Sequence, residues 1–343
     1  MKLHIASETQ YMIQGNGVHT AFVDHVELMN SKEDVDIVIN NEGEGDVFHC
    51  HTYGPYYFWK GLPYKGRRVH TVHVIPDSIK GSLPMWQFFM PFVKWYFKQV
   101  YSFADVCIAI SPRVEEAIRE TGAKTEIVKI YNPIPIERWS NSPEKRAMGR
   151  KMLGLKENEF VVLGVGQLQA RKGVEDFMAV ADALPNARFV WAGGRPFKAM
   201  TEGIARIDKR IASAPSNIQF PGMYNLDVMP LIYAAADMLL FPSYQENCPL
   251  APIEAAACGL PVVFRDIKEY RSLYEHPYLS GVTVNDFIGL TRRIMKDHKF
   301  HANAVILSEN LVKQFDKNLV REKLIGLYQQ LNNRVSNAVP FGI

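Results

Sequence analysis

Short runs of apolar residues alternate along the chain with longer stretches in which apolar residues recur every three or four positions. The short runs are rich in Val, Ile and Phe, which is typical of strands buried on both faces of a parallel sheet. They lie at 3–8, 35–40, 46–52, 67–75 and 105–111, and then at 160–167, 187–194, 217–223, 237–243 and 261–266. This alternation predicts an α/β fold with doubly wound layers.

The stretches between these runs are typical of helices. Residues 111–122 begin with Ser111 as an N-cap, have Pro112 in the first turn and end at Gly122. A polar segment at 136–158 has no strand character and separates the two series of strands. The sequence therefore predicts two Rossmann-like domains, at 1–140 and 150–315. A long amphipathic helix at 316–343 is expected to pack back on the first domain.

Composition limits the class of protein. Hydrophobic residues make up 47% of the chain and charged residues 22%, which is typical of a soluble globular protein. A net charge of +3 does not indicate nucleic acid as a partner. The four cysteines form no CxxC pair, so neither disulfides nor a zinc site are expected, and a reducing cytoplasm fits best. The sequence contains neither a signal peptide nor an apolar stretch of about 18 residues, so no transmembrane helix is expected.

Candidate ligand-binding loops follow the predicted strands, because ligands of open α/β sheets bind at the carboxyl ends of the strands. Gly15 and Gly17 lie between the first strand and a helix, where backbone N–H groups can bind an anion; an ordinary turn fits this loop equally well. Arg171 and Lys172 precede another helix and suit a diphosphate. Two solvated cations also explain that segment taken alone, and the third glycine of a dinucleotide fingerprint is missing.

The strongest signal is the stretch PSYQENCPLAPIEAAACGLPVV at residues 242–263. Glu246 stands in a loop after a strand, and Glu254 comes eight positions later, in the second turn of a helix that begins near Pro249. A glutamate among Ala and Ile is costly to bury unless it is hydrogen-bonded. Two carboxylates beside a helix N-terminus can accept hydrogen bonds from sugar hydroxyls while the backbone N–H groups hold phosphate. The pattern indicates a sugar nucleotide as ligand.

The segment at 84–103, PMWQFFMPFVKWYFKQVYSF, has nine aromatic residues among twenty. Its prolines and lysines exclude a membrane span, and its polar residues form one narrow stripe of a helix. The apolar face is wider than a helix packed on a sheet needs. Residues 56–104 carry a net charge of +6. We therefore predict contact with an anionic membrane, with a helix wedged into the core as the alternative. The predicted contact residues are Trp86, Phe89, Phe92, Lys94, Trp95 and Lys98.

The Glu-x7-Glu pattern in ENCPLAPIE, followed by AAACGLPVV, resembles the signature of retaining glycosyltransferase family 4. The N-terminal glycine loop, DVFHCHT, VHTVH and RKG fall in the order of that family over essentially the whole chain. The resemblance implies the GT-B fold, in which two Rossmann-like domains face a central cleft. The sequences of three stretches, VGQ, RKG and SYQENCPLAPIEAAACGLPVVFRD, are most similar to those of bacterial synthases of glycosyl-diacylglycerols.

The resemblance also implies residue roles. Glu246 would hold hydroxyls of the donor sugar, Glu254 the ribose, and His73 would lie beside the sugar. His73 as a satisfied polar residue at a strand end is the alternative, which we expect for its neighbours His49, His51 and His70. The other implied donor contacts are Gly15, Gly17, Arg171, Lys172, Met223, Tyr224, Asn247, Cys248, Pro249 and Leu250. The family often has Arg where this chain has Gln167, and Arg171 can supply the lost phosphate contact.

The implied reaction is the retaining transfer of glucose or galactose from a UDP-sugar to diacylglycerol or monoglycosyl-diacylglycerol. The enzyme would need no cofactor or metal and would be peripheral on the inner face of the cell membrane. Asp34 and Asp36 imitate a metal-binding Asp-x-Asp motif but lead directly into a strand. Two alternatives are a soluble family 4 transferase acting on a sugar, peptide or polysaccharide, and a non-catalytic protein that binds nucleotide sugars.

Overall fold

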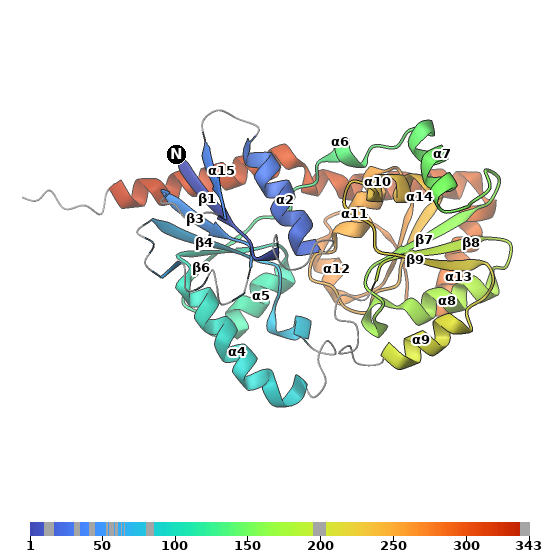
Figure 1. Ribbon diagram of the computed structural model, residues 1–343, viewed down its shortest axis with the longest axis horizontal. Helices are drawn as coiled ribbons and strands as arrows, with labels where there is room; N and C mark the ends of the chain where they lie inside the picture. The colour runs from blue at the N-terminus through green and yellow to red at the C-terminus, as the bar shows by residue number, and fades with distance from the viewer. Residues whose placement is uncertain are drawn as a thin grey trace, which may run out of the picture. The chain divides into compact units, whose positions relative to one another are not determined.

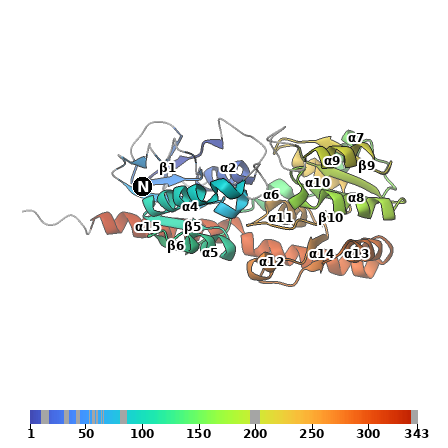
Figure 2. The same ribbon diagram turned by 90° about the horizontal axis from the view of Figure 1, so that it is seen from below.

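The computed structural model describes the chain except residues 10–16, 31–34, 41–44, 53, 55–57, 59–60, 63, 65, 80–85, 195–203 and 337–343, and the side chains of residues 79, 86, 204, 205 and 334–336. The chain forms two compact units. Unit 1 comprises Met1–Lys80, Met85–Pro133 and Phe315–Ile343, and unit 2 comprises Gly81–Pro84 and Ile134–Gln314. Each contains a sheet flanked by helices (Figures 1 and 2).

The sheet of unit 1 has six parallel strands in the order β2-β1-β3-β4-β5-β6. The strands are β1 (Lys2–Ala6), β2 (Asp36–Ile39), β3 (Val47–Cys50), β4 (Arg67–Val72), β5 (Val106–Ala109) and β6 (Glu126–Lys129). The chain adds β2 on one side of β1 and then returns to add β3 on the other side. The topological switch point, where such folds bind ligands, therefore lies between β1 and β3.

Helices cover both faces of this sheet. They are α2 (Gly17–Asn30), η1 (Pro76–Ile79), α4 (Trp86–Phe103), α5 (Pro112–Glu120) and α15 (Lys317–Ser336). Helices α2 and α15 pack on one face, where Phe22 and Leu324 join Leu3 and Val47 in one core cluster. Helices α4 and α5 lie on the other side (Figure 1). Helix α5 has the predicted cap, because Val114 N donates to Ser111 Oγ.

The sheet of unit 2 also has six parallel strands, in the order β12-β11-β10-β7-β8-β9. They are β7 (Val161–Val165), β8 (Arg188–Ala192), β9 (Ile218–Gly222), β10 (Met238–Phe241), β11 (Val262–Arg265) and β12 (Leu279–Gly281). The order along the chain reverses between β9 and β10, so that β10 lies beside β7. The switch point of this unit is therefore between β7 and β10.

The helices of unit 2 are α6 (Ile136–Trp139), α7 (Pro143–Met152), η2 (Ala170–Lys172), α8 (Val174–Ala183), α9 (Ile204–Ala212), α10 (Met229–Ala235), α11 (Leu250–Ala257), α12 (Lys268–Leu273), α13 (Val284–Lys296) and α14 (His298–Val312), followed by η4 (Lys313–Phe315). Helices α8 and α13 bury Phe177 and Phe287 in one cluster with Phe189 of β8. Burial of these apolar faces against the strands is the main favourable contribution to folding.

The polar segment at 136–158 is part of unit 2. Arg150 in α7 is 1% exposed, and it donates to Asp237 Oδ2 at 3.0 Å and to the Glu159 carbonyl at 3.1 Å. Arg146 donates to the other oxygen of Asp237 at 2.6 Å. The segment therefore contains two helices and is bound by partly buried polar contacts to the residues just before β7 and β10, so it is not a free linker.

Every strand predicted from the apolar runs is present, and the described residues contain two further strands. They are β6, with the sequence EIVK, and β12, with the sequence LSG. Both lie at an edge of their sheet and contain only one or two apolar residues. These edge strands form because they pair with a neighbouring strand. Such pairing does not require an apolar run, so the apolar pattern of the sequence did not predict them. None of the helices within the described ranges has the length and apolar character that crossing a membrane requires.

Candidate active site

A buried ion pair lies at the switch point of unit 2. Lys172 of η2 donates to Glu246 Oε1 in the loop after β10, and Ser243 Oγ donates to the same oxygen at 2.7 Å. The side chain of Glu246 is 9% exposed and that of Lys172 14%. The pKa of Lys172 is lowered overall. Burial is the largest cause and Arg171 acts in the same direction, while Glu246 raises the pKa and offsets part of the change. The sequence identified both residues separately but gave no sign that they pair.

The two loops that carry this ion pair are held together by their backbones. Tyr244 N donates to the Arg171 carbonyl at 2.8 Å, and Ser243 Oγ lies 3.1 Å from the same carbonyl oxygen. Gly173, at φ 74°, makes this approach possible, since a Cβ there would lie 2.3 Å from the Pro242 carbonyl oxygen. Strand ends β7 and β10 therefore present Lys172 and Glu246 in a fixed geometry.

Arg171 lies beside the ion pair and is engaged with the protein. Its Nε donates to Gln169 Oε1 at 2.9 Å, and one terminal nitrogen donates to the Gln245 carbonyl at 3.5 Å. The guanidinium thus crosses from one loop to the other. Its place on the loop is compatible with the phosphate contact expected of it.

Helix α11 carries the second glutamate. Glu254 is buried, and Tyr233 Oη donates to its Oε2 at 2.7 Å. This is the hydrogen bond that a carboxylate at an apolar position requires. Burial raises the pKa of Tyr233, and Glu254 raises it further, so the phenol stays protonated and can donate.

The start of α11 is suited to bind an anion. Pro249 occupies the N-cap position and no side-chain hydrogen bond caps the helix from there. The backbone N–H groups of its first turn have no intrahelical partners. Leu250 is buried, while Asn247 and Cys248 are half-buried. Burial and Glu246 raise the pKa of the Cys248 thiol to about 12, which keeps it neutral.

The remaining predicted donor contacts are placed as follows. Met223 and Tyr224 follow the carboxyl end of β9, as the loops with Lys172 and Glu246 follow the carboxyl ends of β7 and β10. Met223 is 56% exposed, and burial raises the pKa of Tyr224. Gly17 opens α2 in unit 1, and a Cβ there would meet no atom within 4 Å, so space alone does not require glycine. Gly15 lies outside the described residues.

His73 follows β4 in unit 1 and is 9% exposed. Its Nε2 is hydrogen-bonded to His51 Nδ1 at 3.0 Å. Burial lowers the pKa of His73 to about 3, with smaller contributions from His70 and His25. The ring is therefore neutral at physiological pH and can act as a hydrogen-bonding group rather than as a cation.

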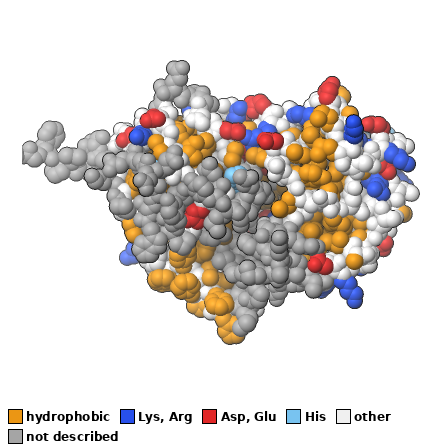
Figure 3. Space-filling view, in the orientation of Figure 1, with side chains coloured by type: hydrophobic (Ala, Val, Ile, Leu, Met, Phe, Trp, Pro, Cys, Tyr) orange, Lys and Arg blue, Asp and Glu red, His pale blue; other side chains and the backbone are white. Residues whose placement is uncertain are grey.

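Helix α4 exposes a run of aromatic side chains. Phe88 is 76% exposed, Phe89 58%, Phe92 64% and Trp95 56%. Hydrophobic side chains gather over this helix at the lower left of the space-filling view (Figure 3). Phe97, Val100 and Tyr101 are buried beneath, and Lys94 and Lys98 are exposed. Only the C-terminal part of the helix thus reaches the core, and the side chain of Trp86 lies outside the described part.

A solvent-open hollow of about 810 Å³ lies elsewhere in unit 2, between β12 and α13. Its lining is mostly charged or small and includes Asp266, Asp286 and Arg293. It shares no residue with the Lys172–Glu246 pair or with α11. We therefore do not assign it to the candidate active site.

Two Rossmann-like units, one with paired charges at its switch point beside a helix carrying a second glutamate, are the parts of a GT-B glycosyltransferase. Residues 34–138 match the family described as Glycosyltransferase Family 4, and residues 159–296 match Glycosyl transferases group 1. The alpha-galactosylglucosyldiacylglycerol synthase of Streptococcus pneumoniae (strain ATCC BAA-255 / R6) is 32% identical over 330 residues, which cover 94% of this chain and 85% of the relative. The chain therefore belongs to the family 4 glycosyltransferases.

Two further comparisons cover nearly the whole chain. The processive diacylglycerol alpha-glucosyltransferase of Acholeplasma laidlawii is 27% identical over 96% of this chain and 98% of its own length. The crystal structure of Anabaena Alr3699/HepE in complex with UDP-glucose superposes with a TM-score of 0.76, at 16% identity, over 96% of this chain and 100% of that one. The predictions of family 4 and of the GT-B fold are thereby confirmed.

Proposed function

We propose that the protein transfers a hexose, glucose or galactose, from a UDP-sugar to diacylglycerol or monoglycosyl-diacylglycerol and so makes a membrane glycolipid. The observation that carries this proposal is the near full-length similarity to two proteins named for glycosylating diacylglycerol or its glycoside. The structural relative named with UDP-glucose supports the choice of donor. The exposed aromatic face of α4 independently supports a lipid as the acceptor, because such a face suits contact with a membrane.

The charges and hydrogen-bond donors at the β7–β10 switch point support a donor site there, with the residue roles that the family resemblance implies. Lys172 and the N–H groups that open α11 bind the diphosphate, Glu246 accepts hydrogen bonds from sugar hydroxyls, and Glu254 does so from the ribose. Negative charge gathers on UDP as the bond to the sugar breaks. Fixed cations and N–H donors that need no reorganisation stabilise that charge in the transition state.

The reaction retains the anomeric configuration by a front-face route. The bond between C1 of the hexose and the phosphate oxygen breaks, and the acceptor oxygen forms its bond to C1 on the same face. The proton of the acceptor hydroxyl passes to a phosphate oxygen of the departing UDP. Because Arg171 and Lys172 supply the positive charge, the transfer is metal-independent, and neutral His73 orients the sugar by hydrogen bonding.

Helix α4 docks the enzyme on the inner face of an anionic membrane, where the lipid acceptor resides. Exposed Phe88, Phe89, Phe92 and Trp95 enter the interfacial region, and the nearby lysines face the lipid phosphates. Such a face is costly to leave in water and matches the amphipathic character of a headgroup layer.

The test is a matrix of UDP-glucose and UDP-galactose against diacylglycerol and monoglycosyl-diacylglycerol. We expect product in the organic phase for one pairing, identified by mass spectrometry, with an α-anomeric proton signal from an α-linked donor. Activity should persist in EDTA. Product in the aqueous phase would support the soluble transferase instead, and donor binding without turnover the non-catalytic protein. A β-linked product would overturn retention, and activity lost in EDTA but restored by Mg²⁺ or Mn²⁺ would overturn metal independence.

A further inference from the structure

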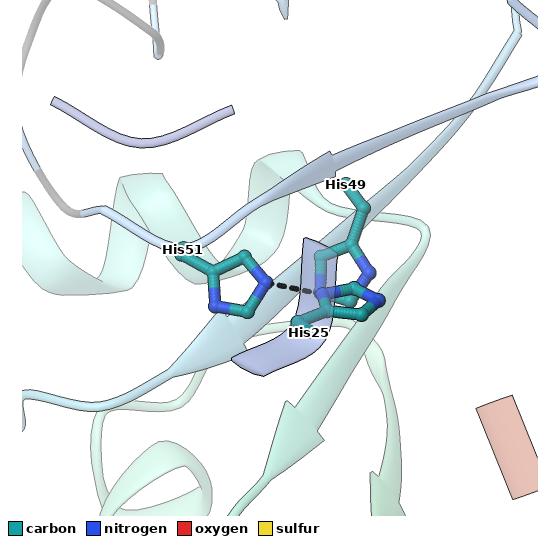
Figure 4. A group of neighbouring side chains, drawn as sticks. All are labelled: His25, His49 and His51. Carbon is teal, nitrogen blue, oxygen red and sulfur yellow. Dashed lines mark hydrogen bonds between the residues drawn. The ribbon is translucent and has the colours of Figure 1, made fainter. Parts of the chain in front are cut away.

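Six side chains of unit 1 form one continuous series of hydrogen bonds that includes His73, and we call it the histidine chain. Its members come from α2, β3, β4, the turns after these two strands, and α15. The bonds are His73 Nε2 to His51 Nδ1 (3.0 Å), His51 Nε2 to His25 Nδ1 (2.6 Å), His25 Nε2 to Tyr328 Oη (3.0 Å), Tyr328 Oη to His49 Nδ1 (2.5 Å) and His49 Nε2 to Thr71 Oγ1 (2.6 Å). Three of the histidines are drawn in Figure 4.

All members of the histidine chain are buried, and its ionisable members are neutral. His49 and Tyr328 are 0% exposed, and the others are 9% exposed or less. Burial lowers the pKa of His25 to about 3 and lowers those of His49 and His51 well below the ordinary value, with neighbouring imidazoles acting in the same direction on these two. Burial raises the pKa of the Tyr328 phenol. The chain therefore consists of neutral imidazoles and neutral hydroxyls.

Neutrality gives the histidine chain a single polarity. A neutral imidazole donates at one nitrogen and accepts at the other, and each interior histidine has both nitrogens in the chain. Tyr328 must likewise accept one bond and donate the other, because a phenol that accepted both would leave its own buried O–H unpaired. Every bond therefore points the same way. Either all four histidines carry their proton on Nε2, or all four carry it on Nδ1.

We propose that His25, His49, His51 and Tyr328 are positioning residues that fix the tautomer of His73. Since the chain engages Nε2 of His73, its polarity decides whether Nδ1 of that ring is a hydrogen-bond donor or an acceptor toward the hexose. The proposal rests on the role proposed for His73 at the donor sugar. It makes the Tyr328 hydroxyl, contributed by the last helix, the link that couples the two halves of the chain.

A metal site is the competing interpretation of the same cluster. His25, His49 and His51 bring ligand nitrogens within 4.8 Å of one another. However, all six of their ring nitrogens are already hydrogen-bonded within the chain. The His25–His51 separation of 2.6 Å is also shorter than the roughly 3.3 Å expected between two nitrogens of a tetrahedral zinc site. The geometry favours the hydrogen-bonded chain.

The first test is the tautomer pattern of the full-length protein, labelled with ¹⁵N at histidine and assigned through single His→Gln variants. Long-range ¹H–¹⁵N spectra at neutral pH should show one shared tautomer for the four chain histidines. In Tyr328→Phe, His49 should become independent of the other three. Tyr64→Phe is the control: it removes the hydroxyl of a ring that packs on Phe48, in a core cluster that contains no member of the histidine chain, and it should keep the shared tautomer. A mixture of tautomers in the wild-type chain would overturn the proposal.

The second test is hexose transfer from the UDP-sugar. Tyr328→Phe should lower kcat by about tenfold, the effect of roughly one hydrogen bond, while Tyr64→Phe should not. Wild-type turnover in a folded Tyr328→Phe enzyme would overturn the coupling. If that variant does not fold, the wild-type tautomers decide alone. Metal at one equivalent in the purified protein, with metal-shifted histidine nitrogens, would establish the metal site instead. A shared tautomer in a protein without transferase activity would overturn the proposed function and leave the chain standing.

Discussion

Lys172 and Glu246 are two charged side chains that are largely removed from water, and their ion pair explains how the protein holds both charges before any substrate is bound. Removing both groups from water is unfavourable, and their mutual attraction together with the Ser243 hydrogen bond offsets that loss. In the proposed reaction each group exchanges its partner for part of the donor, Lys172 for phosphate and Glu246 for sugar hydroxyls. A site of this kind needs little reorganisation when the donor binds.

A double-mutant cycle on this pair is the first prediction. Glu246→Gln and Lys172→Met should each lower kcat/KM by about 10²-fold, since each removes a transition-state contact and leaves the other charge buried and unpaired. The double variant should be impaired much less than the product of the two single effects. Steady-state kinetics with the UDP-sugar measures this. Arg206→Ala breaks the exposed Arg206–Glu175 pair of the same unit and should change nothing. Additive losses would show that the pair does not act as a unit.

His73 supplies the second prediction. His73→Ala should reduce kcat by about 10-fold to 10²-fold, because a neutral imidazole that orients the sugar is lost while the diphosphate contacts remain. Turnover in saturating UDP-sugar is the measurement. The exposed His276 gives the control, since His276→Ala removes an imidazole that is not among the predicted contacts. Unchanged turnover in His73→Ala would remove His73 from the mechanism, and the histidine chain would then have no catalytic role.

Among the elements, α4 shows what an amphipathic pattern can and cannot predict. The sequence identified the aromatic face and its breadth. It could not show which aromatic side chains the sheet covers, because that depends on the rotation of the helix against β3 and β4. The structure buries Phe97 and Tyr101 and leaves Phe92 and Trp95 outside. The exposed set follows the spacing of Phe88, Phe92 and Trp95 along one side of a helix.

Membrane binding by this face is the third prediction. Replacing Phe89, Phe92 and Trp95 by Ser should weaken sedimentation with phosphatidylglycerol vesicles by at least tenfold and leave thermal stability unchanged, because the three side chains are exposed. Neither the wild-type protein nor the triple variant should sediment with neutral vesicles. A matched control replaces Met148, Met152 and Ile306, which are 56%, 49% and 54% exposed in unit 2. Equal binding of the two triple variants would show that α4 is not the docking face.

The candidate site was predicted from the sequence only as separate parts. Glu246, Glu254 and Lys172 were recognisable because each stands in a loop or helix after an apolar strand. Their pairing was not, since Lys172 and Glu246 are 74 positions apart and meet only because β7 and β10 are neighbours in the sheet. The histidine chain was missed for the same reason: it is completed by His25 and Tyr328, which reach it from helices at opposite ends of the sequence.

At the scale of the whole molecule, unit 1 is built from two ends of the chain. Helix α15 follows all of unit 2 in sequence, yet Val320, Leu324, Leu327 and Leu331 are buried in the same cluster as Ile5 of β1. The first 133 residues therefore lack part of their own core, and the N-terminal unit is completed only after the C-terminal unit has been synthesised. Tyr328 belongs to this returning helix, so the interior that it completes also carries the histidine chain.

Acid sensitivity of the whole protein is the fourth prediction. Burial lowers the pKa of five histidines of unit 1, to about 3 for His25 and His73, to about 4 for His70, and well below the ordinary value for His49 and His51. Above pH 6.5 these groups are neutral in both folded and unfolded chains, so they leave stability unaffected. As pH falls below 6.5 the unfolded chain takes up protons that the folded chain refuses, and the free energy of unfolding falls. Each histidine contributes up to about 1.4 kcal/mol per pH unit until its folded pKa is reached.

With five such groups and a stability of ordinary size, acid unfolding should be centred near pH 5, above the range in which carboxylates titrate. Urea unfolding followed by circular dichroism between pH 7.5 and 4.5 measures the slope. His51→Gln removes one of the five groups and should flatten the slope by about 1.4 kcal/mol per pH unit, whatever it does to stability at pH 7.5. His298→Gln changes an exposed histidine of α14 and should leave the slope as it was. A slope that begins only below pH 4.5 would mean that the buried histidines are not the groups that make the fold acid-sensitive.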